Sequence, residues 1–235
     1  MRRALAFVSV MTLSLLSAGP VGAAGIPVPG VDRDNEHIRG DRGAPYSLVE
    51  YSDFECPFCQ RHQGTMTEIL EANMDTVNWV YRHFPLSFHV HAMPTAQLSE
   101  CVADLGGNDA FWGFADIAFA TLDLDTDTLI EEASEAFDLD AKKLKACVDA
   151  AADEEWITER MERVMELGIN GTPTTVLVHN RTGRQYIIQG AVDASQIQKL
   201  IDEVLENEPE IFVENMLDRR ERRRMARLEK WGLME

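Results

Sequence analysis

The sequence has few basic residues outside its two ends. Its 235 residues include 22 Lys and Arg against 40 Asp and Glu, which gives a formal net charge of −18. Two basic residues lie at positions 2 and 3 and seven lie within 219–235, so residues 24–218 hold only 13 basic against 37 acidic side chains. Such a surface repels the phosphates of nucleic acids and anionic lipids. We therefore exclude nucleic acid as a partner and expect a soluble body that handles other proteins.

Cysteine is also scarce, with four residues at positions 56, 59, 101 and 147. A chain of this length with 45% hydrophobic residues can bury a sizeable core, which excludes a miniature fold held together by disulfides. Cys56 and Cys59 form a CxxC pair, and such a pair also suits half of a zinc site. A second CxxC or Cys/His pair at suitable spacing is missing, and the scattered histidines are expected on the surface or in loops. We expect no metal and no cofactor, with zinc as the less favoured alternative.

Long apolar runs are missing after the first 23 residues. The two arginines near the start precede an apolar segment, residues 4–18, that is too short for an ordinary membrane span. A Gly-Pro pair and the small residues 21–23 follow, as expected before a signal peptidase cut. We predict a cleaved signal peptide over residues 1–23 and a periplasmic or otherwise exported location, with an uncleaved N-terminal membrane anchor as the alternative. Export implies an oxidising compartment in which a disulfide can persist.

The hydrophobic pattern predicts strand, helix and strand, then a helical block, then two strands and a helix. A thioredoxin fold interrupted by an inserted all-helical domain, which is an α/β fold of order βαβ…ββα, has this order. We expect the following parts: signal peptide 1–23, linker or loosely docked arm 24–45, first half of the thioredoxin fold 46–91, helical insertion 92–167, second half 168–207, and basic helical tail 208–235.

The CxxC pair lies where the first predicted strand turns into the first helix. Pro57 suits the first turn of that helix, so the Cys56 sulfur is expected at the positive end of the helix dipole. This position favours the thiolate and lowers the pKa of Cys56 below the free value of about 8.5. Cys59 lies one turn further in and is shielded. We therefore predict that Cys56 is the attacking sulfur and Cys59 the resolving one.

A second motif, Thr172-Pro173, stands directly before the third predicted strand. A proline at this place, after a Gly-containing loop, is where the thioredoxin fold carries its cis-proline. A cis bond would present the backbone N–H and C=O of Thr172 beside the sulfurs, where an extended substrate can pair with them like an added strand. An ordinary turn proline is the alternative.

The segment from Val49 to Cys59 resembles the active-site strand and turn of the DsbA family of periplasmic disulfide oxidoreductases. Residues 93–119 resemble the helical insertion of that family, and residues 168–174 resemble its cis-proline loop. The resemblance covers roughly residues 44–207. It implies a thioredoxin fold with a helical insertion and dithiol–disulfide exchange on secreted proteins.

The resemblance also implies roles for single residues. It makes Cys56 the nucleophile, Cys59 the resolving cysteine and Thr172-Pro173 the substrate-binding element. Glu50 matches an acidic residue that the family buries under its disulfide, where a carboxylate can take or relay the Cys59 proton. A solvated strand residue is the equal alternative for this position.

The dipeptide between the cysteines departs from the strongest oxidants of the family, which have Pro-His there. Phe58 follows Pro57 in this chain and supplies no charge to a thiolate, so we expect a weaker oxidant. This departure keeps an isomerase or a reductase open as alternatives to a DsbA-like oxidase.

The remaining two cysteines, Cys101 and Cys147, both fall in predicted helices. In an exported protein we expect them to form a structural disulfide, with two separately buried thiols as the alternative. The tail 208–235 has a very basic middle and could dock on the acidic body, contact anionic lipid or a partner, or remain solvated. Only about 20 residues separate the predicted cut from the first strand, so a dimerisation domain is lacking and we expect a monomer.

Together these features predict an exported thiol–disulfide oxidoreductase that exchanges disulfides with secreted proteins and uses a membrane or soluble redox partner. Two other function classes stay open. One is a non-catalytic thioredoxin-fold binding module or chaperone, against which the intact CxxC counts. The other is a glutathione-dependent transferase or isomerase, which needs no second active-site cysteine, so Cys59 counts against it.

Overall fold

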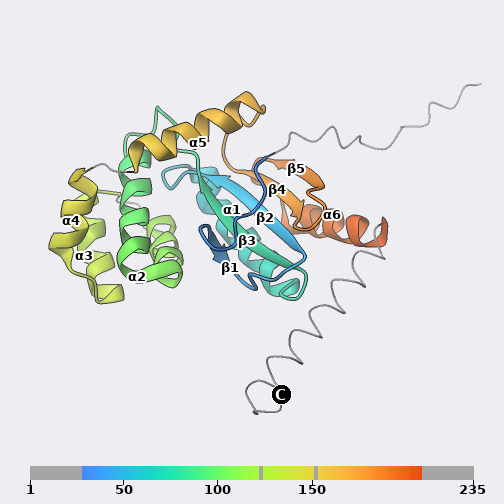
Figure 1. Ribbon diagram of the computed structural model, residues 1–235, viewed down its shortest axis with the longest axis horizontal. Helices are drawn as coiled ribbons and strands as arrows, with labels where there is room; N and C mark the ends of the chain where they lie inside the picture. Colours follow the sequence, from blue (N-terminus) through green and yellow to red (C-terminus); the bar gives the residue numbers. More distant parts are fainter. Residues whose placement is uncertain (1–27, 122–123, 151–152, 208–235) are drawn as a thin grey trace, which may run out of the picture.

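The computed structural model describes residues 28–121, 124–150 and 153–207 (Figure 1). The predicted signal peptide and the basic tail lie outside these ranges. The elements follow the chain in this order: β1 (His37–Arg39), β2 (Tyr46–Ser52), α1 (Pro57–Ala72), β3 (Val77–His83), α2 (Ala92–Ala120), α3 (Thr126–Phe137), α4 (Ala141–Ala150), α5 (Glu154–Glu166), β4 (Thr174–His179), β5 (Gln185–Gln189) and α6 (Ala194–Asn207). The predicted thioredoxin fold with an all-helical insertion is confirmed.

The sheet has five strands in the order β1-β3-β2-β4-β5. Strand β2 is parallel to β3 and antiparallel to β4, so Leu48 lies beside both Trp79 and Leu177. Every residue of β2 is buried, as expected for a central strand covered on both faces. This strand leads directly into the CxxC turn.

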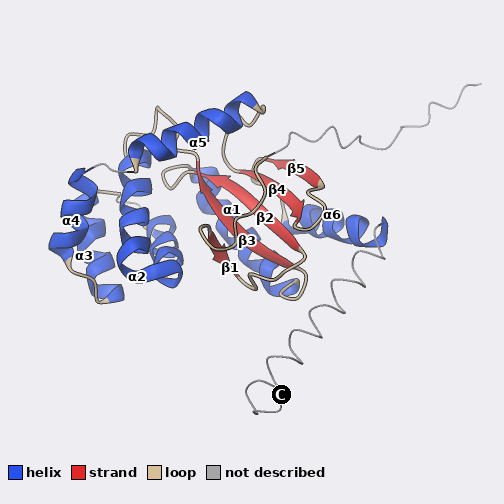
Figure 2. Ribbon diagram, in the orientation of Figure 1, coloured by secondary structure: helices blue, strands red, loops and turns tan. Residues whose placement is uncertain are grey.

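The two faces of the sheet carry separate hydrophobic clusters. Leu48, Trp79 and Leu177 point to the face that packs against α1, α2 and α6. Val49, Val80 and their neighbours point to the opposite face, where α5 and the residues before β1 cover them. In the view of Figure 2, α2, α3 and α4 gather to the left of the sheet and α6 lies to its right.

Strand β1 was not predicted, since residues 24–45 were expected to be a linker or a loosely docked arm. Three residues in a segment rich in Gly, Pro and charge give no strand pattern. The strand exists because it pairs with β3 and because Asn108 of α2 bonds both backbone groups of Ile38 at 2.9 and 3.0 Å. The Asn108 amide thereby covers what would otherwise be an open sheet edge.

One glycine interrupts the helical insertion and another ends it. Helix α2 is interrupted at Gly107, because its φ of 79° is not a helical value. At the other end, Gly168 takes a φ of 93° just after α5, and the N–H of Ile169 bonds the carbonyl of Val164 at 3.1 Å. This is the Schellman closure that a glycine at this place predicts. It returns the chain to the sheet immediately before Thr172-Pro173.

Candidate active site

Cys56 lies at the N-terminus of α1. It is the N-cap residue, with φ −76° and ψ 118°, and Pro57 occupies the first helical position. The helix has no side-chain cap, so its first N–H groups are left for the sulfur or for a ligand. The Cys56 N–H bonds the carbonyl of Asp53 at 3.1 Å, which fixes the turn that leads into the helix.

The two cysteines of the CxxC pair have opposite acidities. Hydrogen bonds lower the pKa of Cys56 to about 5, against the effect of burial. The largest contribution comes from the Cys59 thiol, and smaller ones come from Thr172 and from the backbone N–H groups of Cys59 and Phe58. Burial raises the pKa of Cys59 far above its usual range, and its hydrogen bond to Cys56 and the charge of Glu50 act in the same direction. The outer sulfur is therefore held as a thiolate and the inner one as a thiol.

The Thr172-Pro173 loop lies against the outer sulfur. The peptide bond is cis, and the Thr172 carbonyl oxygen lies 3.7 Å from the Cys56 sulfur although the two residues are 116 positions apart. The loop is held by a bond from the Thr174 hydroxyl to Gly171 and by the Gly190 N–H, which donates to the Pro173 carbonyl at 2.9 Å. The structure therefore brings both sequence motifs together.

Glu50 lies under the CxxC turn. It is 1% exposed, so it is not a solvated strand residue. Burial raises the pKa of Glu50 to about 7, while a 2.8 Å hydrogen bond from the Ser52 hydroxyl acts in the opposite direction. The position of Glu50 on β2 puts it on the same face as Leu48, the face that α1 covers. Because the pKa is near neutrality, the carboxyl group can give up or take a proton under ordinary conditions.

Phe58 points away from the core and is 54% exposed. The Arg61 guanidinium lies 5.1 Å from the centre of its ring. Two more apolar side chains, Phe88 and Val90, are 73% and 75% exposed on the loop after β3. That loop is tied to the CxxC turn, because Leu86 and His89 both donate to the buried carboxylate of Asp53, at 2.9 and 2.8 Å.

The role of Asp53 was not predicted, and two histidines were expected in the wrong place, whereas His89 and His91 do lie on the loop after β3. His62 is 1% exposed, and its Nε2 lies 3.2 Å from the Thr175 hydroxyl, which joins α1 to the strand after the Thr172-Pro173 loop. Burial lowers the pKa of His62 to about 4, so the imidazole is neutral. His83 is also buried and lies 2.7 Å from Glu100. The spacing along α1 could have predicted this burial, because His62 lies on the same helix face as Cys59 and Met66.

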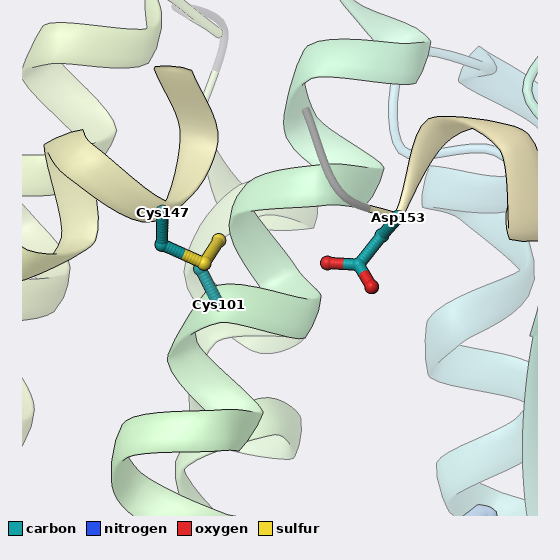
Figure 3. Close-up of side chains that lie close together, drawn as sticks. All are labelled: Cys101, Cys147 and Asp153. Atoms are coloured by element: carbon teal, nitrogen blue, oxygen red, sulfur yellow. A yellow bond between two sulfur atoms is a disulfide. The ribbon is translucent and has the colours of Figure 1, made fainter. Parts of the chain in front are cut away.

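One group of potential metal ligands lies close together in the described parts of the chain: Cys101, Cys147 and Asp153 (Figure 3). The two sulfurs are joined as a disulfide between α2 and α4. A disulfide offers no thiolate to a metal ion, so this group is not a metal site in the oxidised protein.

Comparisons with known proteins agree with the geometry. The thioredoxin family model matches residues 32–203. The crystal structure of Pseudomonas aeruginosa DsbA2 is similar with 29% identity and a TM-score of 0.62, over 77% of this chain and 99% of that one. Oxidised BdbD from Bacillus subtilis shares the fold, with 19% identity, a TM-score of 0.63, and coverage of 74% and 95% of the two chains.

Sequence relatives of a different kind also match. The Na(+)/H(+) antiporter NhaA 3 of Salinispora tropica is 31% identical over 169 residues, which are 72% of this chain and 25% of the antiporter. NhaA of Herminiimonas arsenicoxydans is 30% identical over 74% of this chain and 26% of its own length. The chain thus spans about a quarter of the curated relatives that it matches. On the family model and the similarity to DsbA2, the chain belongs to the thioredoxin family, as a DsbA-type member with a helical insertion.

Proposed function

We propose that this protein is an exported thiol–disulfide oxidoreductase that oxidises thiols of other proteins, with Cys56 as nucleophile and Cys59 as resolving cysteine. The observation that carries the proposal is the opposite acidity of the two sulfurs at the N-terminus of α1. A sulfur that is stable as a thiolate is both a ready nucleophile and a good leaving group.

The reaction begins with the Cys56–Cys59 disulfide. A substrate thiolate attacks the Cys56 sulfur, the bond between the cysteines breaks, and Cys59 leaves with the electron pair and takes up a proton. A second substrate thiolate then attacks the substrate sulfur of the mixed disulfide and expels Cys56 as a thiolate. The substrate loses two electrons and gains a disulfide, and the enzyme pair is reduced. A redox partner must reoxidise the pair.

Glu50 is the group that donates a proton to Cys59 and accepts it back. The Cys59 sulfur is too basic to leave as a free thiolate, because burial and the neighbouring negative charges oppose its ionisation. A carboxyl group with a pKa of about 7 can deliver the proton as that bond breaks and recover it in the reverse direction.

The surroundings of Cys56 favour a protein substrate. The Thr172 carbonyl lies beside the reactive sulfur, where an extended chain can pair with the loop. Phe58 on the CxxC turn and Phe88 and Val90 on the loop tied to it are exposed and can provide apolar contacts. An unfolded chain with cysteines offers both a free backbone and apolar side chains.

Export is the part of the proposal that rests on the sequence, through the predicted signal peptide 1–23. None of the helices in the described ranges is long and apolar enough to cross a membrane. An exported location gives the Cys56–Cys59 pair a supply of newly translocated proteins with free thiols.

The test is the pH dependence of alkylation in the reduced protein. We expect the Cys59→Ser variant to react with iodoacetamide at a single site, Cys56, with an apparent pKa at least about one unit below the free value of 8.5. The Cys56→Ser variant should react only slowly near neutral pH, because Cys59 is then a buried thiol. Equal alkylation rates of the two variants would exclude the assignment.

A further inference from the structure

A cavity of about 220 Å³ lies between the sheet, α5 and the segment 28–36, which we call the N-terminal arm. None of the residues of the CxxC pair or the Thr172-Pro173 loop lines it. Its floor contains Tyr51 and Arg82, and its walls contain Glu36, Trp156 and Arg160. The cavity is smaller than the roughly 300–1,000 Å³ of pockets for drug-sized ligands, so it suits a molecule of about one ring.

Guanidinium groups gather at this cavity in an otherwise acidic protein. Only 13 basic side chains lie between residues 24 and 218, and three of them, Arg82, Arg160 and Arg163, line this one space. Arg82 is neutralised by Glu36 at 2.6 Å. For Arg160 and Arg163 no carboxylate lies within 4.0 Å in residues 28–121, 124–150 and 153–207.

The acidic groups in the lining are already engaged. Glu100 lies 2.9 Å from His37 and 2.7 Å from His83. The Asp32 carboxylate accepts hydrogen bonds within its own turn, from the Asp34 N–H and the Asn35 side chain. The charge of Asp32 also acts on Arg160 without direct contact. Arg160 and Arg163 on α5 are therefore the cations of the cavity that have no carboxylate in direct contact among the described residues.

Aromatic rings and one unused polar atom complete the lining. The Trp156 indole is 37% exposed and lies under the Arg160 guanidinium, 4.1 Å from the ring centre. Tyr51 is buried and lines the cavity, whereas the Tyr81 ring packs on the other face of the sheet against Phe54 and Phe111. His83 is 7% exposed, and its Nδ1 has no hydrogen-bond partner among the described residues. Two guanidinium groups without a contacting carboxylate in the described residues, together with flat apolar walls, suit an anion that carries a ring.

We propose that this cavity is a binding site for a small aromatic carboxylate, separate from the thiol-exchange site. The carboxylate is held by Arg160 and Arg163, and the ring lies between Trp156 and Tyr51. Arginine suits this role because its planar group binds a carboxylate through two parallel hydrogen bonds. This inference does not depend on the proposed function, since it uses none of the groups that exchange thiols.

The test uses three probes with the full oxidised protein at low ionic strength. Benzoate carries both ring and charge, inorganic phosphate carries charge alone, and benzyl alcohol carries the ring alone. We expect benzoate to bind saturably at one site and to shift the NMR signal of the Trp156 indole N–H, assigned with a Trp156→Phe variant. The signals of the buried Trp79 and Trp112 should stay in place. Phosphate and benzyl alcohol should each bind at least about tenfold more weakly.

Substitutions test which arginines bind the carboxylate. Arg160→Gln and Arg163→Gln should each weaken benzoate binding about tenfold, while Lys142→Gln, an equal charge change on exposed α4, should leave it unchanged. Both arginines are exposed, so the variants should fold, and near-UV circular dichroism checks this. Absence of saturable benzoate binding would overturn the site. Equal binding of phosphate and benzoate, or equal weakening by all three substitutions, would overturn the assignment to an aromatic carboxylate held by α5.

Discussion

Phe58 is the residue through which we expect the redox potential to be most easily changed. Its backbone N–H helps to stabilise the Cys56 thiolate, but its side chain adds no charge. We therefore expect a wild-type potential between those of thioredoxin, about −270 mV, and DsbA, about −120 mV. Phe58→His should move the potential toward the oxidising end by about 30 mV for each pK unit of extra thiolate stabilisation.

Equilibration with glutathione buffers, followed by quantification of the oxidised fraction, measures this shift. Phe58→Leu is the matched control, since it removes the ring without adding a donor and should change the potential much less. A wild-type potential at or above that of DsbA, or a shift of Phe58→His toward reduction, would contradict this electrostatic account.

Glu50 gives a prediction about rate. Glu50→Gln cannot exchange the Cys59 proton, so reduction of the Cys56–Cys59 disulfide by a dithiol should slow by at least about tenfold near neutral pH. The wild-type rate profile should bend near pH 7, where Glu50 titrates, and the variant should lack that bend. Glu68→Gln, an exposed carboxylate on the same helix as the cysteines, serves as control. An unchanged profile in Glu50→Gln would remove Glu50 from the proton path.

The reactive cysteines of this site could be predicted from the sequence more reliably than the residues that surround them. The CxxC spacing and the helix start identify Cys56 and Cys59 because a helix N-terminus acts locally on the sulfur next to it. The burial of Glu50 was implied by the family resemblance but could not be predicted from the strand pattern, which does not say whether a face is covered. His62 was misplaced for a related reason, because its contact with Thr175 joins residues 113 positions apart.

At the scale of elements, the Cys101–Cys147 disulfide ties α2 to α4 across 46 positions. Closing a loop of this length in the unfolded chain should stabilise the protein by about 4 kcal/mol in the chain-entropy model. We expect the Cys101→Ser/Cys147→Ser double variant to lose about this amount in equilibrium unfolding by urea, with the Cys56–Cys59 pair still able to exchange. A loss below about 1 kcal/mol would mean that the insertion is held by its packing alone.

Helices and strands with a clear local sequence pattern were predicted. Those that form only through contacts with residues distant in the sequence were not. Helix α1, strands β2 to β5 and the glycine break after α5 all follow from local pattern and turn chemistry. Strand β1 has three residues and exists through β3 and Asn108. The arm before it is fastened by Arg82, which donates to the backbone carbonyls of Pro29 and Gly30. Such contacts form only in the folded chain, so the residue pattern of the arm does not predict them.

At the scale of the whole molecule, two buried groups make opposite contributions to the pH dependence of stability. The folded pKa of Glu50, about 7, lies above its unfolded value near 4.5, so its contribution to stability is present below pH 4.5 and is lost as pH rises to 7. The folded pKa of His62, about 4, lies below its unfolded value near 6.5, so stability is lost as pH falls from 6.5 to 4. Each effect is about 3 kcal/mol at most, and the two largely cancel between pH 4.5 and 6.5.

Single variants should separate the two effects. In the reduced protein, Glu50→Gln should become more stable, relative to wild type, as pH rises from 4.5 to 7, and His62→Gln should become more stable, relative to wild type, as pH falls from 6.5 to 4. Urea unfolding at several pH values measures both. Parallel stability profiles for all three proteins would show that neither group titrates as the structure indicates.

The separation of Cys56 and Thr172 by 116 positions also has a consequence for how each copy of the protein matures. At about 5–20 residues per second, the ribosome needs about 6 to 23 s to make the chain between them. During that interval Cys56 and Cys59 are already present, but β4, the neighbour of β2, has not been made. Cys101 appears in the same interval, before its partner Cys147. In an oxidising compartment, a chain that arrives in this order can pair its own cysteines wrongly. Such a copy is itself a substrate of the kind that we propose for the finished protein.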